Sequence, residues 1–322
     1  MSRRPTSVAV QALVLMLSTP VAAESGTGVG LQQRFRKVIV RRARLKRLRP
    51  RPRPRRHRPP PRTVGWGSGE RLTFEVSIEG IEAARSAIAV GARKRRSGRS
   101  VLKIRAMGET IPFVSGFYRM REEQVSLVAL DQLSPLRTTS KRIIGSKTRE
   151  IETRHGAVTE QRIIKRNRPE PPVARTQRRR RIRRRPFDPL SALFHLRSQP
   201  SALGQRTVLW ILAGTALYEV QLSVAARERI DSKLGIRPCL RLDGTARRIF
   251  DDGRPIPSKP PRKLSLWLTD DEARLPLRVA GETKLGLVDA KISSYEPPTQ
   301  RLSLRLLASA FFASTPASSV RK

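Results

Sequence analysis

Cysteine is almost absent from this chain, whose 322 residues contain only Cys239. One thiol excludes an internal disulfide, so a hydrophobic core must hold the fold together even in an oxidising compartment. The apolar neighbours Leu240 and Leu242 favour a buried structural role for Cys239. The alternative is a reactive or intermolecular thiol.

Histidine is also scarce, and the three residues His57, His155 and His195 stand far apart in the sequence. Catalytic metal centres draw several ligands from histidine, cysteine and carboxylates, and no HExxH, CxxC or paired-histidine spacing occurs here. We therefore expect neither a metal site nor a cofactor. Ser191 lies four residues before His195 and could contact it on a helix, but a serine in a first helical turn more often bonds to backbone groups. No catalytic residue is predicted, and the protein is expected not to be an enzyme.

The sequence has no apolar run of the roughly 20 residues that a transmembrane helix needs. The apolar run Val8–Leu17 follows Arg3 and Arg4 and precedes the small residues Val21-Ala22-Ala23. This pattern predicts a cleavable secretory signal peptide over residues 1–23, with an uncleaved amphipathic anchor as the alternative. No cysteine follows the run to carry a lipid. We expect an exported protein of the periplasm or outer envelope, with no transmembrane span after cleavage.

Acidic residues are few: 26 Asp and Glu stand against 67 Lys and Arg, and the formal net charge is +41. Arginine supplies 54 of the 67 basic residues. Guanidinium groups suit bidentate pairing with phosphate and carboxylate, so the charge favours anionic partners. Compositional drift towards arginine codons would give the same count without functional meaning.

Two arginine blocks hold much of the excess charge. One lies in a Pro-rich arm at residues 24–68, where proline alternation and charge repulsion predict a disordered, extended chain and where the Gly-rich segment 65–69 is interpreted as a linker. The other lies in a predicted loop at residues 166–186. The candidate polyanion-binding residues are Arg41, Arg42, Arg47, Arg55 and Arg56 in the arm, and Arg178, Arg179, Arg180, Arg181, Arg183, Arg184 and Arg185 in the loop.

Aromatic residues make up only 5% of the chain. The arginine blocks lack the regularly interleaved aromatic side chains on which single-stranded nucleic acid stacks. Nucleic acid remains an alternative partner but is not favoured. Lipid, lipopolysaccharide or another anionic envelope surface is the expected partner.

Short runs between and after the blocks alternate apolar and polar residues, as in Leu72–Ile78, Val101–Ala106 and Lys263–Leu268. Alternation with a period of two is typical of half-buried strands, and segments such as Asp243-Gly244 are predicted turns. Many short strands favour a mainly β domain over residues 69–296, built as a curled antiparallel sheet or an up-and-down β-barrel. Residues 297–322 are expected to form a C-terminal extension.

One segment has helical character. Asp188 is a good N-cap, and Pro189 suits the first helical position. The apolar residues that follow share one face, which ends at Arg197. A short helix here would cover the curled sheet or one end of a barrel.

The adjacent carboxylates Asp270 and Asp271 form the most prominent acidic cluster. An acid–base pair would need both carboxylates to face one cleft, whereas neighbouring aspartates in a hairpin favour a turn that pairs with a local base such as Arg274. Arg197 is expected to pair with one of these aspartates as a buried structural clamp. Trp267 is out of phase with its leucine neighbours, so it is predicted to face the opposite side of the strand.

Three motifs follow one another along the chain. They are Gly69–Val76 at the start, Asp188–Leu193 with Arg197 in the middle, and Leu266–Asp271 with Arg274–Arg278 (including Pro276) near the end. In this order they resemble a bacterial exported family known as domain of unknown function 3108, over roughly Gly69–Glu296. The resemblance implies a secreted, mostly β domain and brings no agreed activity. The arginine blocks depart from the usual pattern of the family.

Two functions are compatible with these features. The first is a non-enzymatic binding or carrier module of the envelope, in which a curled sheet holds an apolar or lipid ligand. The alternative is a polyanion-binding protein that acts through its Arg-rich segments on lipopolysaccharide, an anionic membrane surface or nucleic acid.

Overall fold

The computed structural model describes residues 62–167, 174–283 and 286–304. The predicted signal peptide, the arm up to residue 61 and the tail from residue 305 lie outside these residues. The described chain is mainly β, as the sequence predicts, and every pairing between its strands is antiparallel.

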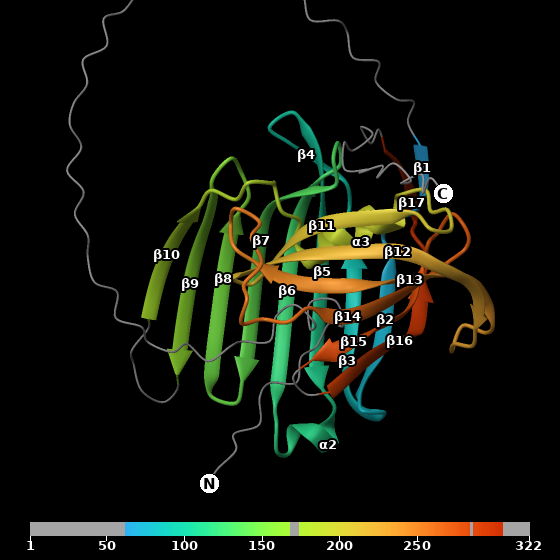
Figure 1. The fold of residues 1–322 in the computed structure, drawn as a ribbon, viewed down its shortest axis with the longest axis horizontal. Helices are drawn as coiled ribbons and strands as arrows, with labels where there is room; N and C mark the ends of the chain where they lie inside the picture. Colours follow the sequence, from blue (N-terminus) through green and yellow to red (C-terminus); the bar gives the residue numbers. More distant parts are fainter. Residues whose placement is uncertain (1–61, 168–173, 284–285, 305–322) are drawn as a thin grey trace, which may run out of the picture. The chain divides into compact units, whose positions relative to one another are not determined.

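Fifteen strands form one large sheet (Figure 1). They are β2 (Arg71–Ile78), β3 (Ile81–Val90), β4 (Lys94–Arg96), β5 (Arg99–Thr110), β6 (Met120–Ala129), β7 (Ser134–Ile144), β8 (Lys147–Arg154), β9 (Thr159–Asn167), β10 (Ala174–Arg180), β11 (Arg206–Ala213), β12 (Ala216–Ile230), β13 (Arg237–Ile249), β14 (Arg262–Thr269), β15 (Pro276–Thr283) and β16 (Gly286–Glu296).

The sheet order is β10-β9-β8-β7-β6-β5-β3-β2-β16-β15-β14-β13-β12-β11, with β4 added beside β5. Neighbours in space are mostly neighbours in sequence, except that β3 pairs with β5 and β2 pairs with β16. The path ends at β10 and β11, which do not pair with each other, so among the described strands the sheet is not closed. Of the two predicted architectures, the structure has the curled sheet.

The predicted helix is α3 (Pro189–Arg197), and it lies between two parts of the curled sheet. It contacts β5 and β6 on one side and β11 on the other. Figure 1 shows β11 and β12 crossing in front of β5 and β6, with α3 beside them. All nine helical residues are buried, so the helix fills the interior with its whole circumference and not only with the apolar face predicted from its periodicity. A second, four-residue helix, α2 (Pro112–Ser115), follows β5.

The Gly-rich segment after the arm is a strand and not a linker, which corrects the predicted arm of residues 24–68. β1 (Arg62–Ser68) pairs with β17 (Gln300–Leu304), so part of the predicted C-terminal extension is also a strand. Gly67 permits this pairing, because a Cβ atom there would lie 2.0 Å from the carbonyl oxygen of Gln300. Trp66 of β1 is fully buried and packs edge-on against Phe194 of α3.

Two further predictions were wrong. Residues 174–180, placed in a disordered loop, form β10, because pairing with β9 satisfies the backbone and an edge strand can expose arginines on both sides. Asp243-Gly244, taken as a turn, lies inside the continuous strand β13. Gly244 is there because a Cβ atom would lie 1.8 Å from the carbonyl oxygen of Gln221 on β12.

Candidate anion-binding groove

The candidate site is a basic groove between β10 and the turn that follows β13, with a volume of about 890 Å³. Seven arginines and two aspartates line it, together with apolar and neutral residues. We call it the arginine groove; its charged residues are Arg178, Arg179, Arg180, Arg181, Arg183, Arg248, Arg254, Asp251 and Asp252.

Strand geometry divides the arginines of β10 between its two sides. Successive side chains of a strand point to opposite sides, so Arg178 and Arg180 share one side of β10 and Arg179 takes the other. Arg180 connects β10 to the turn after β13 and to the turn between β11 and β12. Its guanidinium pairs with the Asp251 carboxylate, with Nε 3.0 Å from Oδ1, and its Nη1 donates to the carbonyl oxygen of Thr215 at 2.9 Å.

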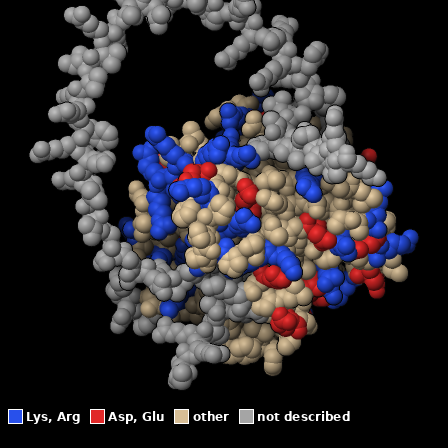
Figure 2. Space-filling model, in the orientation of Figure 1, with Lys and Arg blue, Asp and Glu red and all other residues tan. Residues whose placement is uncertain are grey.

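The groove keeps a strong excess of positive charge, because its two carboxylates are already engaged. Asp251 pairs with Arg180, and Asp252 pairs with Arg254 at 2.7 Å. Hydrogen bonds from the backbone and side chain of Arg254 lower the pKa of Asp252. In Figure 2, Lys and Arg side chains gather over β9, β10 and the turn after β13, with a few acidic side chains among them.

The structure divides the predicted polyanion-binding residues. Arg178 to Arg181 and Arg183 line the groove, whereas Arg184 and Arg185 turn away from it. The five arm candidates, Arg41, Arg42, Arg47, Arg55 and Arg56, lie outside the described residues. Arg248 and Arg254 were missed, because they come from a different region of the sequence and the nearby Asp251-Asp252-Gly253 turn was the only local signal.

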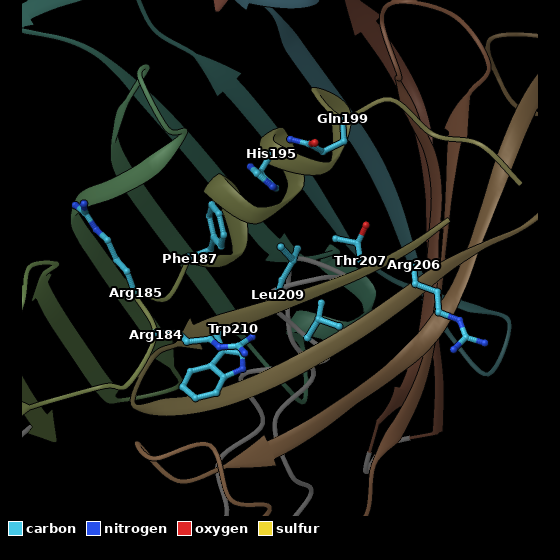
Figure 3. A pocket seen from close by; sticks show the side chains of 10 residues that line it. Arg184, Arg185, Phe187, His195, Gln199, Arg206, Thr207, Leu209 and Trp210 are labelled. Atoms are coloured by element: carbon cyan, nitrogen blue, oxygen red, sulfur yellow. The ribbon is translucent and has the colours of Figure 1, made fainter. Parts of the chain in front are cut away.

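Arg184 and Arg185 flank a second, small pocket between α3 and β11 (Figure 3). His195 and Phe187 face β11 there, and their rings lie 4.7 Å apart. Burial lowers the pKa of His195 to about 4, so its imidazole is neutral at pH 7. The pocket has a volume of about 20 Å³, which is room for about one water molecule and not for an acyl chain.

The start of α3 is a buried polar network. The Asp188 carboxylate caps the helix by accepting from the backbone N–H groups of Leu190 and Ser191, and Ser191 Oγ accepts from the Asp188 N–H. Ser191 thus bonds to the backbone, as the sequence indicates. Asp188 also accepts from Gln124 and Ser126 of β6, at 3.1 and 2.5 Å.

Arg197 is a buried clamp, but its carboxylate partner is not one of the predicted aspartates. It forms a bidentate ion pair with Glu70, at 2.7 and 2.8 Å, and both side chains are fully buried. The predicted partner loop supplies carbonyl oxygens: Arg197 donates to Ala273 and Arg274. The aspartates could not reach this position because they hold their own turn.

That turn has the structure predicted for Asp270 and Asp271. Asp270 pairs with Arg274 at 3.3 Å, and Asp271 accepts from the Thr269 hydroxyl at 2.6 Å. Pro276 begins the following strand, β15.

Two more residues singled out in the sequence are buried structural groups. Trp267 packs on the side of β14 opposite its leucine neighbours, where the guanidinium of Arg278 lies 4.7 Å from its ring centre and Glu228 accepts from its indole N–H. Cys239 is a buried free thiol, and burial raises its pKa. Cys239 is buried as the sequence analysis favours; Trp267 faces the predicted side of the strand but is buried there, and does not lie at the surface.

Two features are absent from the described residues. No group of three or more His, Cys, Asp or Glu side chains in this part of the chain could hold a metal ion. No helix within residues 62–167, 174–283 and 286–304 is long and apolar enough to cross a bilayer.

The fold and groove define a class of protein: a curled antiparallel sheet domain with a buried capped helix and a basic edge. The chain belongs to the family described as "Protein of unknown function (DUF3108)", whose model matches residues 73–293, more than half of its length. This finding confirms the resemblance found in the sequence. No curated protein matches the chain.

Three solved structures are similar to this chain at low identity. A β-barrel-like protein of the domain of unknown function DUF1849 from Brucella abortus is 8% identical, with a TM-score of 0.44, and the match covers 73% of this chain and 100% of that one. A protein described as exported and YmcC-like in fold, from Bacteroides fragilis, is 8% identical with a TM-score of 0.30, over 73% and 99% of the two chains. A protein described as a lipoprotein, from Parabacteroides distasonis, is 8% identical with a TM-score of 0.32, also over 73% and 99%.

Proposed function

We propose that this protein acts outside the cytoplasm, in the cell envelope, as a non-enzymatic binding module for polyanions, with the arginine groove as its binding surface. The observation that carries the proposal is the groove itself, where five more arginines surround two aspartates that already pair with Arg180 and Arg254. Guanidinium groups bind phosphate through charge-assisted, often bidentate hydrogen bonds. The predicted signal peptide supports the location.

The ligand chemistry we propose is a surface or polymer that carries closely spaced phosphate groups. Lipopolysaccharide and anionic lipid headgroups both fit this description. One aromatic residue, Phe250, lines the groove, and the Arg254 guanidinium already lies over its ring. Base stacking, which strengthens binding of single-stranded nucleic acid, therefore has little support here.

The small pocket beside α3 does not support a lipid carrier that encloses an acyl chain. A cavity with room for about one water molecule does not admit an acyl chain in the described conformation. An anionic lipid would therefore bind through its phosphate at the groove, while its chains stay in the bilayer.

The test is retention of the purified mature protein on heparin and on vesicles that contain phosphatidic acid. The variant Arg179→Gln/Arg181→Gln/Arg183→Gln spares Arg180 and so keeps the link to Asp251. The control Arg105→Gln/Arg121→Gln/Arg137→Gln removes the same charge from exposed arginines of β5, β6 and β7.

The groove variant is expected to elute from heparin at clearly lower salt than the control, because each lost ionic contact weakens binding. Each lost contact also reduces the slope of log K against log[salt] by about 0.7–0.9. Equal elution of the two variants would refute the groove as the binding surface. Binding to heparin but not to phosphatidic acid vesicles would restrict the ligand to soluble polyanions.

A further inference from the structure

Arg149 lies on β8 behind the arginine groove, on the side that faces the turn between β11 and β12. Its Nη2 donates to the Thr215 hydroxyl at 3.2 Å. The carbonyl of the same Thr215 accepts from Arg180 of β10. Thr215 and Arg178 both line the groove, so Arg149, which is not itself a lining residue, borders the floor of the groove through its hydrogen bond to Thr215.

The charges around Arg149 do not balance. Arg142, directly opposite on β7, forms a bidentate ion pair with Glu122, with distances of 2.8 to 3.0 Å, and both of these side chains are largely buried. Glu122 is thus committed to Arg142. Among the described residues, no carboxylate lies within ion-pair distance of Arg149, and Arg178 adds a further positive charge nearby.

Arg149 also has an unused donor. Its Nε is buried, and within the described part of the chain it has no hydrogen-bond partner. A buried N–H group without a partner costs about 1–3 kcal/mol and is rare in folded proteins. Burial, followed by the charges of Arg142 and Arg178, lowers the pKa of Arg149, and Glu122 offsets only part of this effect.

We propose that Arg149, together with the Thr215 hydroxyl and the Arg178 guanidinium, binds a single phosphate group, either inorganic phosphate or a phosphate monoester. This inference deepens the proposed function and rests on the same groove, since it names a specific site at the groove floor. The planar guanidinium of Arg149 offers several donors in a fork that matches a tetrahedral oxyanion. A phosphate here would supply the missing negative charge and an acceptor for Nε.

The test measures thermal unfolding of the mature protein with and without inorganic phosphate, at constant ionic strength set with chloride. Phosphate is expected to raise the Tm of the native protein. The variant Arg149→Gln is expected to lose this rise and to weaken phosphate binding, measured by calorimetry, about tenfold or more. Arg149→Lys, which keeps the charge but lacks the fork, is expected to lose most of the rise.

The matched control is Arg166→Gln, on the outer face of the neighbouring strand β9, where Arg166 pairs with Glu150. It is expected to keep the native response to phosphate. A native protein whose Tm does not respond to phosphate, or an Arg149→Gln variant that responds as the native protein does, would overturn the site.

Heparin elution separates this inference from the proposed function. Arg149→Gln is expected to elute close to the native protein, whereas the triple groove variant elutes early. Loss of the phosphate response with unchanged heparin binding supports the Arg149 site. Phenyl phosphate and phosphatidic acid vesicles then distinguish a soluble monoester from a lipid headgroup as the source of the phosphate.

Discussion

The ion pair between Glu70 and Arg197 holds the start of β2 against the end of α3 without any contact with water. Removing one partner of a buried pair leaves the other charge uncompensated and costs about 3–5 kcal/mol. We therefore expect Glu70→Gln to lower the free energy of unfolding, measured in urea, by about that amount. The exposed pair Arg71–Glu296, 3.9 Å apart, provides the control: Glu296→Gln is expected to change stability by about 0–1 kcal/mol. Equal effects of the two variants would contradict a structural role for the Glu70 carboxylate.

His195 makes stability depend on pH. Its pKa is about 4 in the folded protein, because of burial, and about 6.5 in the unfolded chain. Above about pH 6.5 neither state binds the proton, whereas between about pH 6.5 and 4 the unfolded chain takes it up and the folded protein does not. Stability is therefore fully present above this window and falls as the pH drops through it.

The variant His195→Phe isolates this effect, because it keeps a ring against Phe187 and removes the titrating group. We expect it to retain about 2 kcal/mol more of its stability than the native protein between about pH 7 and pH 5, measured by urea unfolding. His155, whose pKa burial also lowers to about 4, titrates in both proteins and cancels from the comparison. Parallel pH profiles for the two proteins would show that His195 is protonated as readily in the fold as in the unfolded chain.

At the scale of elements, α3 depends on its capping residue. Asp188 caps the helix and also accepts from two side chains of β6, so its loss would free buried donors in two elements. We expect Asp188→Ala to destabilise the fold by about 2 kcal/mol or more, at or beyond the upper end of the usual range for a cap. Asp188→Asn keeps an acceptor for the helix and is expected to recover part of the loss. Far-ultraviolet circular dichroism in urea measures both; an unchanged Asp188→Ala midpoint would contradict the network.

Elements with local signals could be predicted from the sequence. Asp188 and Pro189 specify where α3 begins, and alternating residues specify strands such as β2 and β14. The Asp270-Asp271 turn was predictable because its partner, Arg274, lies four residues away.

Features that depend on distant partners could not be predicted. β10 is a strand because β9 lies beside it, and β1 is a strand because β17 returns from the other end of the domain. Glu70 could not be predicted as the partner of Arg197 either, because 127 residues separate them in the sequence. The candidate groove was half predicted: the Arg178–Arg183 run is visible in the sequence, while Arg248 and Arg254 join it only through the curl of the sheet.

At the scale of the whole molecule, the β1–β17 pair predicts that the folded domain extends to β17. Leu302 and Leu304 of β17 are buried, and β1 carries the fully buried Trp66. A chain that ends at Glu296 is expected to unfold at a Tm several degrees lower than the full protein, with Trp66 exposed to water. A chain that ends at Ser309 keeps β17 and is expected to unfold as the full protein does. Tryptophan fluorescence on heating measures the difference, and equal Tm values for both truncations would place the domain end at β16.

The pairing of β2 with β16 has a consequence for the order of events during synthesis. A ribosome releases β2 early and β16 more than two hundred residues later, so the centre of the sheet cannot form until nearly all of the domain has emerged. Pairings between such distant segments form slowly, so β2 is expected to join β16 late, after hairpins of sequence neighbours such as β6 and β7 have formed. The topology thus makes the completion of the sheet, and not the formation of its hairpins, the step that waits for the end of synthesis.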